Sequence, residues 1–295
     1  GGQVSDTGSL SVNGKELSVA EAKAAAGYIL HVLSDEMVSV SVGDSCAAQV
    51  DLTRRSDIMP NHTMTHVVNF ALREILGNEV NQKGSIVDNE KLRFDFSHNK
   101  PVTAKQIQEV QNIVNAQIKE NLSVHTREVA LADAQKINGL RAVFGEVYPD
   151  PVRVVSVGPT IDDLLSDPSN AEWAKRSIEF CGGTHLKSTS DAEDFAIIEE
   201  VGTAKGIRRV TAVTKGQARL AFQNANEFSA LIDATAQISD LGKLASQLAL
   251  LKGLIDDTEK AMPFALRENL RELIVRENKR YLDEKKKASA EAAAK

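Results

Sequence analysis

The stretch Asn61-His62-Thr63-Met64-Thr65-His66-Val67 sets two histidines four residues apart. In a helix, this spacing places both imidazoles on one face, one turn apart, where they can reach a single metal ion. A distant stretch, Cys181-Gly182-Gly183-Thr184-His185, offers a thiol and an imidazole at the same spacing. The four side chains make a ligand set suited to tetrahedral zinc. The alternative is a chance spacing of core or surface histidines, and the Cys-His partner favours the metal.

We expect the helix that carries the two histidines to begin at Pro60 and Asn61 and to end before Gly77. At about 100° per residue, His62 and His66 fall opposite its apolar stripe and therefore point away from the core that this helix builds. The stripe consists of Met64, Val67, Val68, Ala71, Leu72 and Ile75.

Length and composition indicate a soluble globular protein. The chain has 295 residues, of which 42% are hydrophobic and 26% charged, enough for one large or two ordinary domains. No apolar run approaches the roughly 18 residues that span a membrane, and no signal peptide is recognised, so no membrane partner is expected. Two cysteines cannot build a disulfide framework, which predicts a reducing, cytoplasmic compartment, with Cys46 as a small buried residue. Because residue 1 is glycine, we expect a fragment of a longer protein.

The net charge of −6 argues against non-specific nucleic-acid binding through bulk charge. A local exception is the run that contains Lys205, Arg208, Arg209 and Lys215, with no acidic residue after Glu200. This run predicts a basic groove, and an ordinary solvated face is the alternative.

The chain divides into three expected parts of an α+β protein. Residues 1–55 are predicted to form a small β module that is incomplete at its start, residues 56–215 the zinc-binding domain, and residues 216–295 a helical connector or oligomerisation segment. In the β module we expect the strands Ser9–Val12, Lys15–Val19, Tyr28–Leu33 and Met37–Val42, the first two joined by a type I′ turn at Asn13-Gly14.

The middle part mixes strands and helices. Expected strands are Leu92–Phe96, Pro151–Val157, Ser177–Phe180, Phe195–Glu200 and Ile207–Val213. One helix is expected after a capping box at Thr103. Two further helices are expected at Leu131–Ile137 and Ile161–Leu165. Further on, a 3-4-3-4 seam indicates helix packing or dimerisation through Leu241, Leu244, Leu248, Leu251 and Ile255.

Spacing alone leaves the chemistry of the metal site open. Zinc with three protein ligands and one open position polarises a carbonyl or activates water, whereas four protein ligands are more typical of a structural site. The sequence has no serine–histidine–carboxylate set and no phosphate-cradling glycine loop. A hydrolase and a structural zinc module are both compatible with these residues.

Both metal motifs resemble those of the alanyl-tRNA synthetase editing domain, of the eukaryotic cytosolic type. The resemblance reaches to about residue 215, and the helices beyond resemble the connector to that enzyme's C-terminal oligomerisation domain. Threonyl-tRNA synthetase editing domains share the paired metal motifs but not the glycine-rich opening. The flanking stretches that also fit are Gly1-Gly2-Gln3…Asp6…Gly8, Leu92-Arg93-Phe94-Asp95-Phe96-Ser97-His98, Arg141-Ala142-Val143-Phe144-Gly145, Tyr148-Pro149-Asp150-Pro151-Val152-Arg153 and Gly206-Ile207-Arg208-Arg209.

The resemblance implies hydrolysis of the ester that joins serine or glycine to the alanine tRNA. It implies a zinc cofactor held by His62, His66, Cys181 and His185, with Gln3 lining the pocket and Thr65 in contact with substrate. Lys205, Arg208 and Arg209 are the expected tRNA contacts, and the C-terminal helices offer a possible homodimer. No aminoacylation domain is recognised, so we do not expect this chain to charge tRNA.

Two other functions stay open at this stage. One is a non-catalytic, zinc-stabilised module for RNA binding and dimerisation. The other is a threonyl-type editing domain. The sequence does not fix the serine–glycine preference or the groups that transfer protons.

Overall fold

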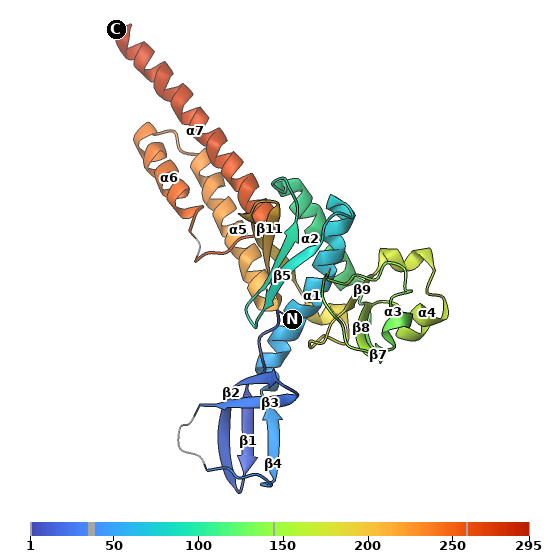
Figure 1. The fold of residues 1–295 in the computed structure, drawn as a ribbon. Helices are drawn as coiled ribbons and strands as arrows, with labels where there is room; N and C mark the ends of the chain where they lie inside the picture. The colour runs from blue at the N-terminus through green and yellow to red at the C-terminus, as the bar shows by residue number, and fades with distance from the viewer. Residues whose placement is uncertain (1, 35–38, 144, 258, 295) are drawn as a thin grey trace.

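The computed structural model describes residues 2–34, 39–143, 145–257 and 259–294 (Figure 1). Within these ranges the chain forms three antiparallel sheets and seven α-helices, which confirms the α+β class. The strands are β1 (Gly8–Val12), β2 (Lys15–Ala25), β3 (Tyr28–Leu33), β4 (Cys46–Val50), β5 (Gln82–Val87), β6 (Leu92–Ser97), β7 (Val124–Val129), β8 (Val152–Val157), β9 (Ser177–Phe180), β10 (Phe195–Ala204) and β11 (Ile207–Thr214). The helices are α1 (Leu52–Leu76), α2 (Ala104–Lys119), α3 (Leu131–Ala134), α4 (Ile161–Ser166), α5 (Lys215–Ala236), α6 (Leu241–Leu254) and α7 (Phe264–Ala293).

The first sheet has the strand order β3-β2-β1-β4 and lies at one end of the molecule (Figure 1). The expected turn between β1 and β2 is confirmed, since Asn13 and Gly14 both have positive φ, of 51° and 75°. The strand expected at Met37–Val42 is wrong in its described part, residues 39–42. Ser41 donates its backbone N–H to the Asp44 carboxylate at 2.8 Å, and this turn interrupts the chain before β4.

Cys46 is exposed rather than buried, contrary to the expectation from its small apolar side chain. It begins β4, an edge strand that pairs only with β1 among the strands that the structure describes. The residues that the module does bury are Val12, Leu17 and Val19.

Two stretches of chain join this sheet to the rest of the molecule and run beside each other. Arg54 donates to the Ser5 carbonyl at 2.7 Å, and the backbone N–H of Asp51 donates to the Thr7 carbonyl at 2.9 Å. Arg55 binds both carboxylate oxygens of Asp6, at 3.0 and 2.5 Å. The start of α1 is therefore tied to residues 5–7 of the glycine-rich opening.

The ligand helix α1 begins at Leu52, earlier than its proline suggested, with Asp51 as the N-cap. Pro60 lies inside the helix, where it has no N–H to donate to the carbonyl of Ser56, four residues earlier. Lys215 replaces that donor, because its Nζ lies 2.9 Å from the Ser56 oxygen. The expected end of the helix at Gly77 is confirmed.

The main core lies between α1, α2 and the second sheet, which has the order β10-β11-β6-β5. The apolar stripe of α1 enters this core as expected, and the capping box at Thr103 begins α2. Alternate residues of β10 face opposite sides: Phe195 and Ile197 face the main core, whereas Ala196 packs against α5. The sheet is thus covered on both faces by helices.

The third sheet, β7-β8-β9, packs with α3 and α4 around a second core (Figure 1). Its strand β9 ends at Phe180, directly before the Cys-Gly-Gly-Thr-His loop. The strand therefore delivers Cys181 to a position beside α1.

The C-terminal helices α5, α6 and α7 pack on one another, and α5 and α7 also pack on the second sheet. The last part of α7 projects away from the rest of the protein (Figure 1). The expected seam is used within the chain, since Leu244, Leu248, Leu251 and Ile255 are buried. Arg280 of α7 donates to the carbonyls of Thr235 and Ile238 at the end of α5. None of the described helices combines the length and apolar character needed to cross a membrane.

Candidate metal centre

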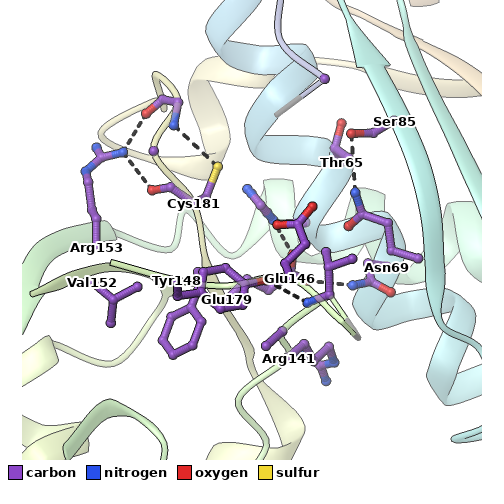
Figure 2. Close-up of a pocket in the computed structure, with 18 of the residues that line it drawn as sticks. Thr65, Asn69, Ser85, Arg141, Glu146, Tyr148, Val152, Arg153, Glu179 and Cys181 are labelled. Atoms are coloured by element: carbon purple, nitrogen blue, oxygen red, sulfur yellow. Dashed lines mark hydrogen bonds and ion pairs between the residues drawn. The ribbon is translucent and has the colours of Figure 1, made fainter. Parts of the chain in front are cut away.

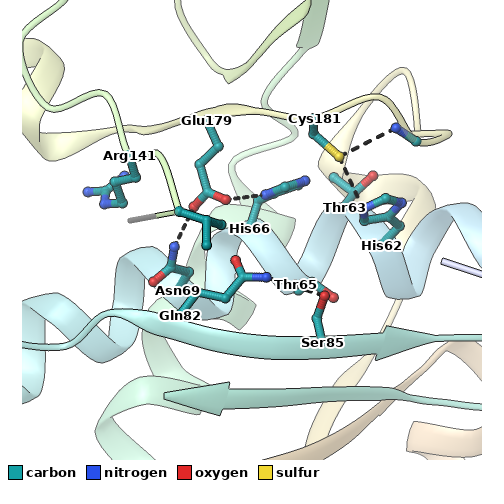
Figure 3. Close-up of polar contacts among 12 residues, drawn as sticks. His62, Thr63, Thr65, His66, Asn69, Gln82, Ser85, Arg141, Glu179 and Cys181 are labelled. Carbon is teal, nitrogen blue, oxygen red and sulfur yellow. Dashed lines mark hydrogen bonds and ion pairs between the residues drawn. The ribbon is translucent and has the colours of Figure 1, made fainter. Parts of the chain in front are cut away.

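The structure brings together the four residues that the sequence predicted as metal ligands. Figure 3 shows three of them, His62, His66 and Cys181. His62 and His66 come from α1, and Cys181 and His185 from the loop after β9. One ligand atom from each side chain lies within 4.8 Å of all the others. Cys181 Sγ lies 3.3 Å from His62 Nε2. This grouping satisfies the first requirement of a single metal ion bound by residues far apart in sequence.

Each imidazole has an outer hydrogen-bond partner for its Nδ1 atom. His62 donates to Gln3 Oε1 at 2.5 Å, and His66 donates to Glu179 Oε2 at 2.5 Å. His185 Nδ1 makes a longer contact of 3.5 Å with the Thr63 hydroxyl. In the neutral rings of His62 and His66, Nδ1 carries the proton that these oxygens accept, so Nε2 keeps its lone pair for a metal.

These residues fit a zinc ion. Nε2 of His66 and Nε2 of His185 are buried and have no hydrogen-bond partner in the described part of the chain, which is costly for polar atoms unless a ligand occupies the space between them. Imidazole nitrogen and thiolate sulfur are both zinc ligands, and four such atoms suit tetrahedral coordination. We therefore treat the cluster as a candidate zinc site.

The charges around the cluster also favour a cation. Burial alone would raise the pKa of the Cys181 thiol, but the adjacent imidazoles of His185, His62 and His66 lower this pKa to about 2. Burial lowers the pKa of His185 to about 3, so this imidazole is neutral at pH 7. Burial also opposes protonation of His66, but Glu179 and Cys181 outweigh it and raise the pKa of His66 to about 10. A bound cation would supply the positive charge that the thiolate and Glu179 attract.

The two glycines of the ligand loop are not equivalent. A Cβ atom on Gly183 would lie 2.1 Å from Cε1 of His62, whereas one on Gly182 would meet nothing within 4 Å. Arg153 supports the same loop by donating to the carbonyls of Cys181 at 3.0 Å and Gly183 at 2.6 Å. Close packing against His62 therefore requires glycine at position 183 only.

The cluster forms part of the wall of an open cavity of about 680 Å³ (Figure 2). The lining includes Gln3, Thr65, His62, His66 and Cys181. Thr65 donates its hydroxyl proton to the Asn61 carbonyl at 2.8 Å, which leaves the oxygen lone pairs as acceptors. On the facing strand β5, Gln82 donates to the Ser85 hydroxyl at 3.3 Å. The cluster of candidate metal-binding side chains can thus be reached by a bound molecule in the cavity.

The expected basic groove has most of its charge neutralised. Arg208 binds both carboxylate oxygens of Glu200 at 2.6 Å, and Arg209 binds Asp95 at 2.6 and 2.7 Å. Lys205 is exposed at the turn between β10 and β11. These residues do not line the cavity, whose own arginines are Arg73, Arg141 and Arg153.

The residues that support the ligands were not predicted from the sequence. Glu179 accepts from His66 and also from Asn69, at 2.8 Å. A signal was present, since Glu179 stands two residues before Cys181 on a strand and Asn69 three residues after His66 on a helix, which places each near a ligand. The role of Arg153 in holding the ligand loop depends on tertiary packing and leaves no local pattern.

Comparison with known proteins agrees with the motifs. Residues 152–211, from β8 through the Cys-Gly-Gly-Thr-His loop to β11, match the family described as threonyl and alanyl tRNA synthetase second additional domain. The alanine–tRNA ligase of Candida albicans is 46% identical over 96% of this chain. The mitochondrial alanine–tRNA ligase of Saccharomyces cerevisiae is 52% identical over 81% of the chain, and the cytoplasmic one of Dictyostelium discoideum 47% over 86%.

The resemblance to the alanyl-tRNA synthetase editing domain is confirmed. The chain spans 31%, 24% and 27% of the lengths of these three relatives, so it corresponds to one part of such an enzyme.

Proposed function

We propose that this chain hydrolyses the ester bond of an alanine tRNA mischarged with serine or glycine, at a zinc ion held by His62, His66, Cys181 and His185. The observation that carries this proposal is that three of the four clustered side chains, His62, His66 and Cys181, lie in the wall of an open cavity. Four protein ligands are more typical of a structural zinc site, but a structural ion needs no access from a cavity, whereas a substrate must reach a catalytic one. The match to the threonyl and alanyl tRNA synthetase second additional domain and the similarity to alanine–tRNA ligases support this class of substrate.

Zinc at this position would act as a Lewis acid toward the ester carbonyl or toward water. The chain's own residues hold the reacting ester in place. Thr65 offers its hydroxyl oxygen to the amino acid from α1, beside His62 and His66. The Gln82–Ser85 pair faces it across the cavity.

Selectivity follows from these polar groups. A serine hydroxyl can donate to the Thr65 oxygen, whereas alanine would leave polar groups in the cavity without a partner. A site built to bind a hydroxyl can reject an analogue without it by several orders of magnitude. This accounts for removal of serine while correctly charged alanine is spared, and it does not extend to glycine, which has no hydroxyl.

Binding of the negatively charged tRNA 3′ end requires positively charged side chains near the cavity. Arg73, Arg141 and Arg153 line the cavity, and none of them forms an ion pair within the part of the chain that the structure describes. We propose that they attract the phosphates of the tRNA 3′ end. At the β10–β11 hairpin, Lys205 offers an exposed charge, whereas Arg208 and Arg209 would have to share theirs with Glu200 and Asp95.

We propose in addition an oligomeric state, a location and a type of editing domain. A homodimer would use the projecting end of α7, because the seam of α6 is already buried within the chain. A cytoplasmic location agrees with the cytoplasmic Dictyostelium relative, while the Saccharomyces relative is mitochondrial. The alanyl rather than the threonyl type is favoured by the alanine–tRNA ligase relatives.

The test is release of amino acid from alanine tRNA charged with serine, glycine or alanine, with zinc quantified on the same protein sample. We expect hydrolysis of the mischarged tRNAs, and loss of both zinc and hydrolysis in Cys181→Ala. An unchanged rate in a Cys181→Ala protein without zinc would refute the mechanism. Bound zinc with no hydrolysis of any of the three would instead favour the non-catalytic RNA-binding module.

A further inference from the structure

Gln3, near the start of the chain, lies where strand β5, helix α1 and the Cys181–His185 loop meet. Its backbone sits beside the edge of β5, because the Val4 N–H donates to the Val87 carbonyl at 2.9 Å and the Val87 N–H donates to the Gly2 carbonyl at 2.8 Å. A Cβ atom on Gly2 would lie 1.9 Å from the Ser85 carbonyl oxygen. The opening of the chain is thereby fixed against the cavity wall, and the Gln3 side chain starts from a defined position.

A single oxygen of Gln3 joins the two halves of the ligand cluster. Its Oε1 accepts the His62 Nδ1 proton at 2.5 Å, the Thr184 backbone N–H at 2.9 Å and the Thr184 hydroxyl at 3.1 Å. His62 belongs to α1, whereas Thr184 belongs to the loop that carries Cys181 and His185. The same atom therefore sets the distance between the helix and the loop.

This contact also determines which tautomer the neutral His62 imidazole adopts. An amide oxygen can only accept, so the proton of neutral His62 must be on Nδ1. The lone pair is then on Nε2, the atom that lies 3.3 Å from Cys181 Sγ. With the opposite tautomer, Nδ1 and Oε1 would face each other as two acceptors at 2.5 Å, which is repulsive.

The two other imidazoles have separate outer partners. Glu179 accepts from His66 and is itself held by Asn69, and Thr63 contacts His185 while accepting the Leu186 N–H at 3.0 Å. Of these outer partners, Gln3 is the one that enters the site from the N-terminal opening of the chain. It therefore makes the geometry of the cluster depend on residues 2–4.

We propose that Gln3 is a positioning residue of the metal centre, which fixes the tautomer of His62 and holds the Cys181–His185 loop at the correct distance. This role rests on the proposed zinc site and adds a function to a residue that the resemblance assigned only to the pocket lining. Loss of an outer-shell partner of this kind lowers metal affinity about 10- to 100-fold.

The experiment measures zinc affinity by competition with a chromophoric chelator, in the complete chain. Gln3→Met removes the acceptor at nearly constant size, Gln3→Glu keeps an acceptor oxygen, and Gln82→Met is the control for losing a cavity glutamine that touches no ligand. We expect Gln3→Met to bind zinc roughly 10- to 100-fold more weakly. Gln3→Glu and Gln82→Met should bind it about as tightly as the original chain, within roughly threefold, a margin well below that loss.

Substitution of Co²⁺ gives a second measurement, because its visible bands report the ligand geometry directly. We expect altered bands for Gln3→Met and unaltered bands for Gln82→Met. Equal zinc affinity and equal Co²⁺ spectra in Gln3→Met would overturn the positioning role while leaving the zinc site intact. Failure of the original chain to bind either metal would overturn the zinc site itself, and the role of Gln3 with it.

Discussion

The two halves of the ligand cluster are built in different ways. His62 and His66 stand on α1, where helical hydrogen bonds and an apolar stripe fix the backbone whether or not a metal is bound. Cys181 and His185 stand in an irregular loop with two glycines, which is held by side chains from elsewhere, Arg153 and Gln3. The difference teaches that the helical half is preformed by local structure, whereas the loop half depends on long-range contacts. Substitutions that act on the loop should therefore weaken metal binding most.

The largest effect is expected from Gly183→Ala. The new methyl group would lie 2.1 Å from Cε1 of His62, so the loop or the imidazole must move. Overpacking of this kind costs about 1–3 kcal/mol, which corresponds to roughly a 5- to 150-fold loss of zinc affinity when the strain falls on the bound geometry. Gly182→Ala is the matched control, since its methyl group would meet nothing within 4 Å. Equal zinc affinities for the two variants, measured by chelator competition, would contradict the difference drawn between these glycines.

A smaller effect is expected from Glu179→Gln, which tests the helical half. The substitution keeps an oxygen that can accept from His66 but removes the negative charge that the buried pair shares. Zinc affinity should fall about tenfold, at the lower end of the range for outer-shell partners. Asn69→Ala serves for comparison, because it leaves the carboxylate and removes only the neutral bond at 2.8 Å. If Asn69→Ala weakened zinc binding more than Glu179→Gln, charge would not be the main contribution of this pair.

The smallest effect on the metal is expected from Lys215→Met. This variant leaves the Ser56 carbonyl beside Pro60 without its donor, which should lower the free energy of unfolding by about 1 kcal/mol. Zinc affinity should not change, because α1 continues through the ligand turn with its own hydrogen bonds. Urea unfolding of the metal-free chain measures the free energy of unfolding, and chelator competition measures the zinc affinity. A tenfold loss of zinc affinity in Lys215→Met would show that the helical half is less independent than its geometry indicates.

The sequence was informative wherever a local period governs structure. The i, i+4 histidines, the stripe of α1, the capping box at Thr103 and the Asn13-Gly14 turn all follow from spacing, and the structure has each of them. Pro60 was misleading because a residue 155 positions away, Lys215, supplies the missing donor. Cys46 was misleading because its burial depends on what covers an edge strand, and composition carries no information about that.

The candidate site shows the same limit. Its ligands could be predicted because each pair has a recognisable spacing. Their outer partners could not be assigned, because Gln3 reaches His62 across 59 positions and Glu179 reaches His66 across 113. The basic run at residues 205–209 had a pattern, but only the fold shows that Asp95 lies beside Arg209.

The double attachment of the N-terminal sheet has a mechanical consequence. A unit on one covalent linker can rotate about that linker, but here residues 5–7 and the start of α1 are bonded side by side through Ser5, Asp6 and Thr7. Any rotation of the sheet would have to break the Asp6–Arg55 pair and would pull directly on Gln3, three residues earlier. A movement of the N-terminal sheet is therefore transmitted through residues 5–7 to Gln3 and so to the candidate zinc site.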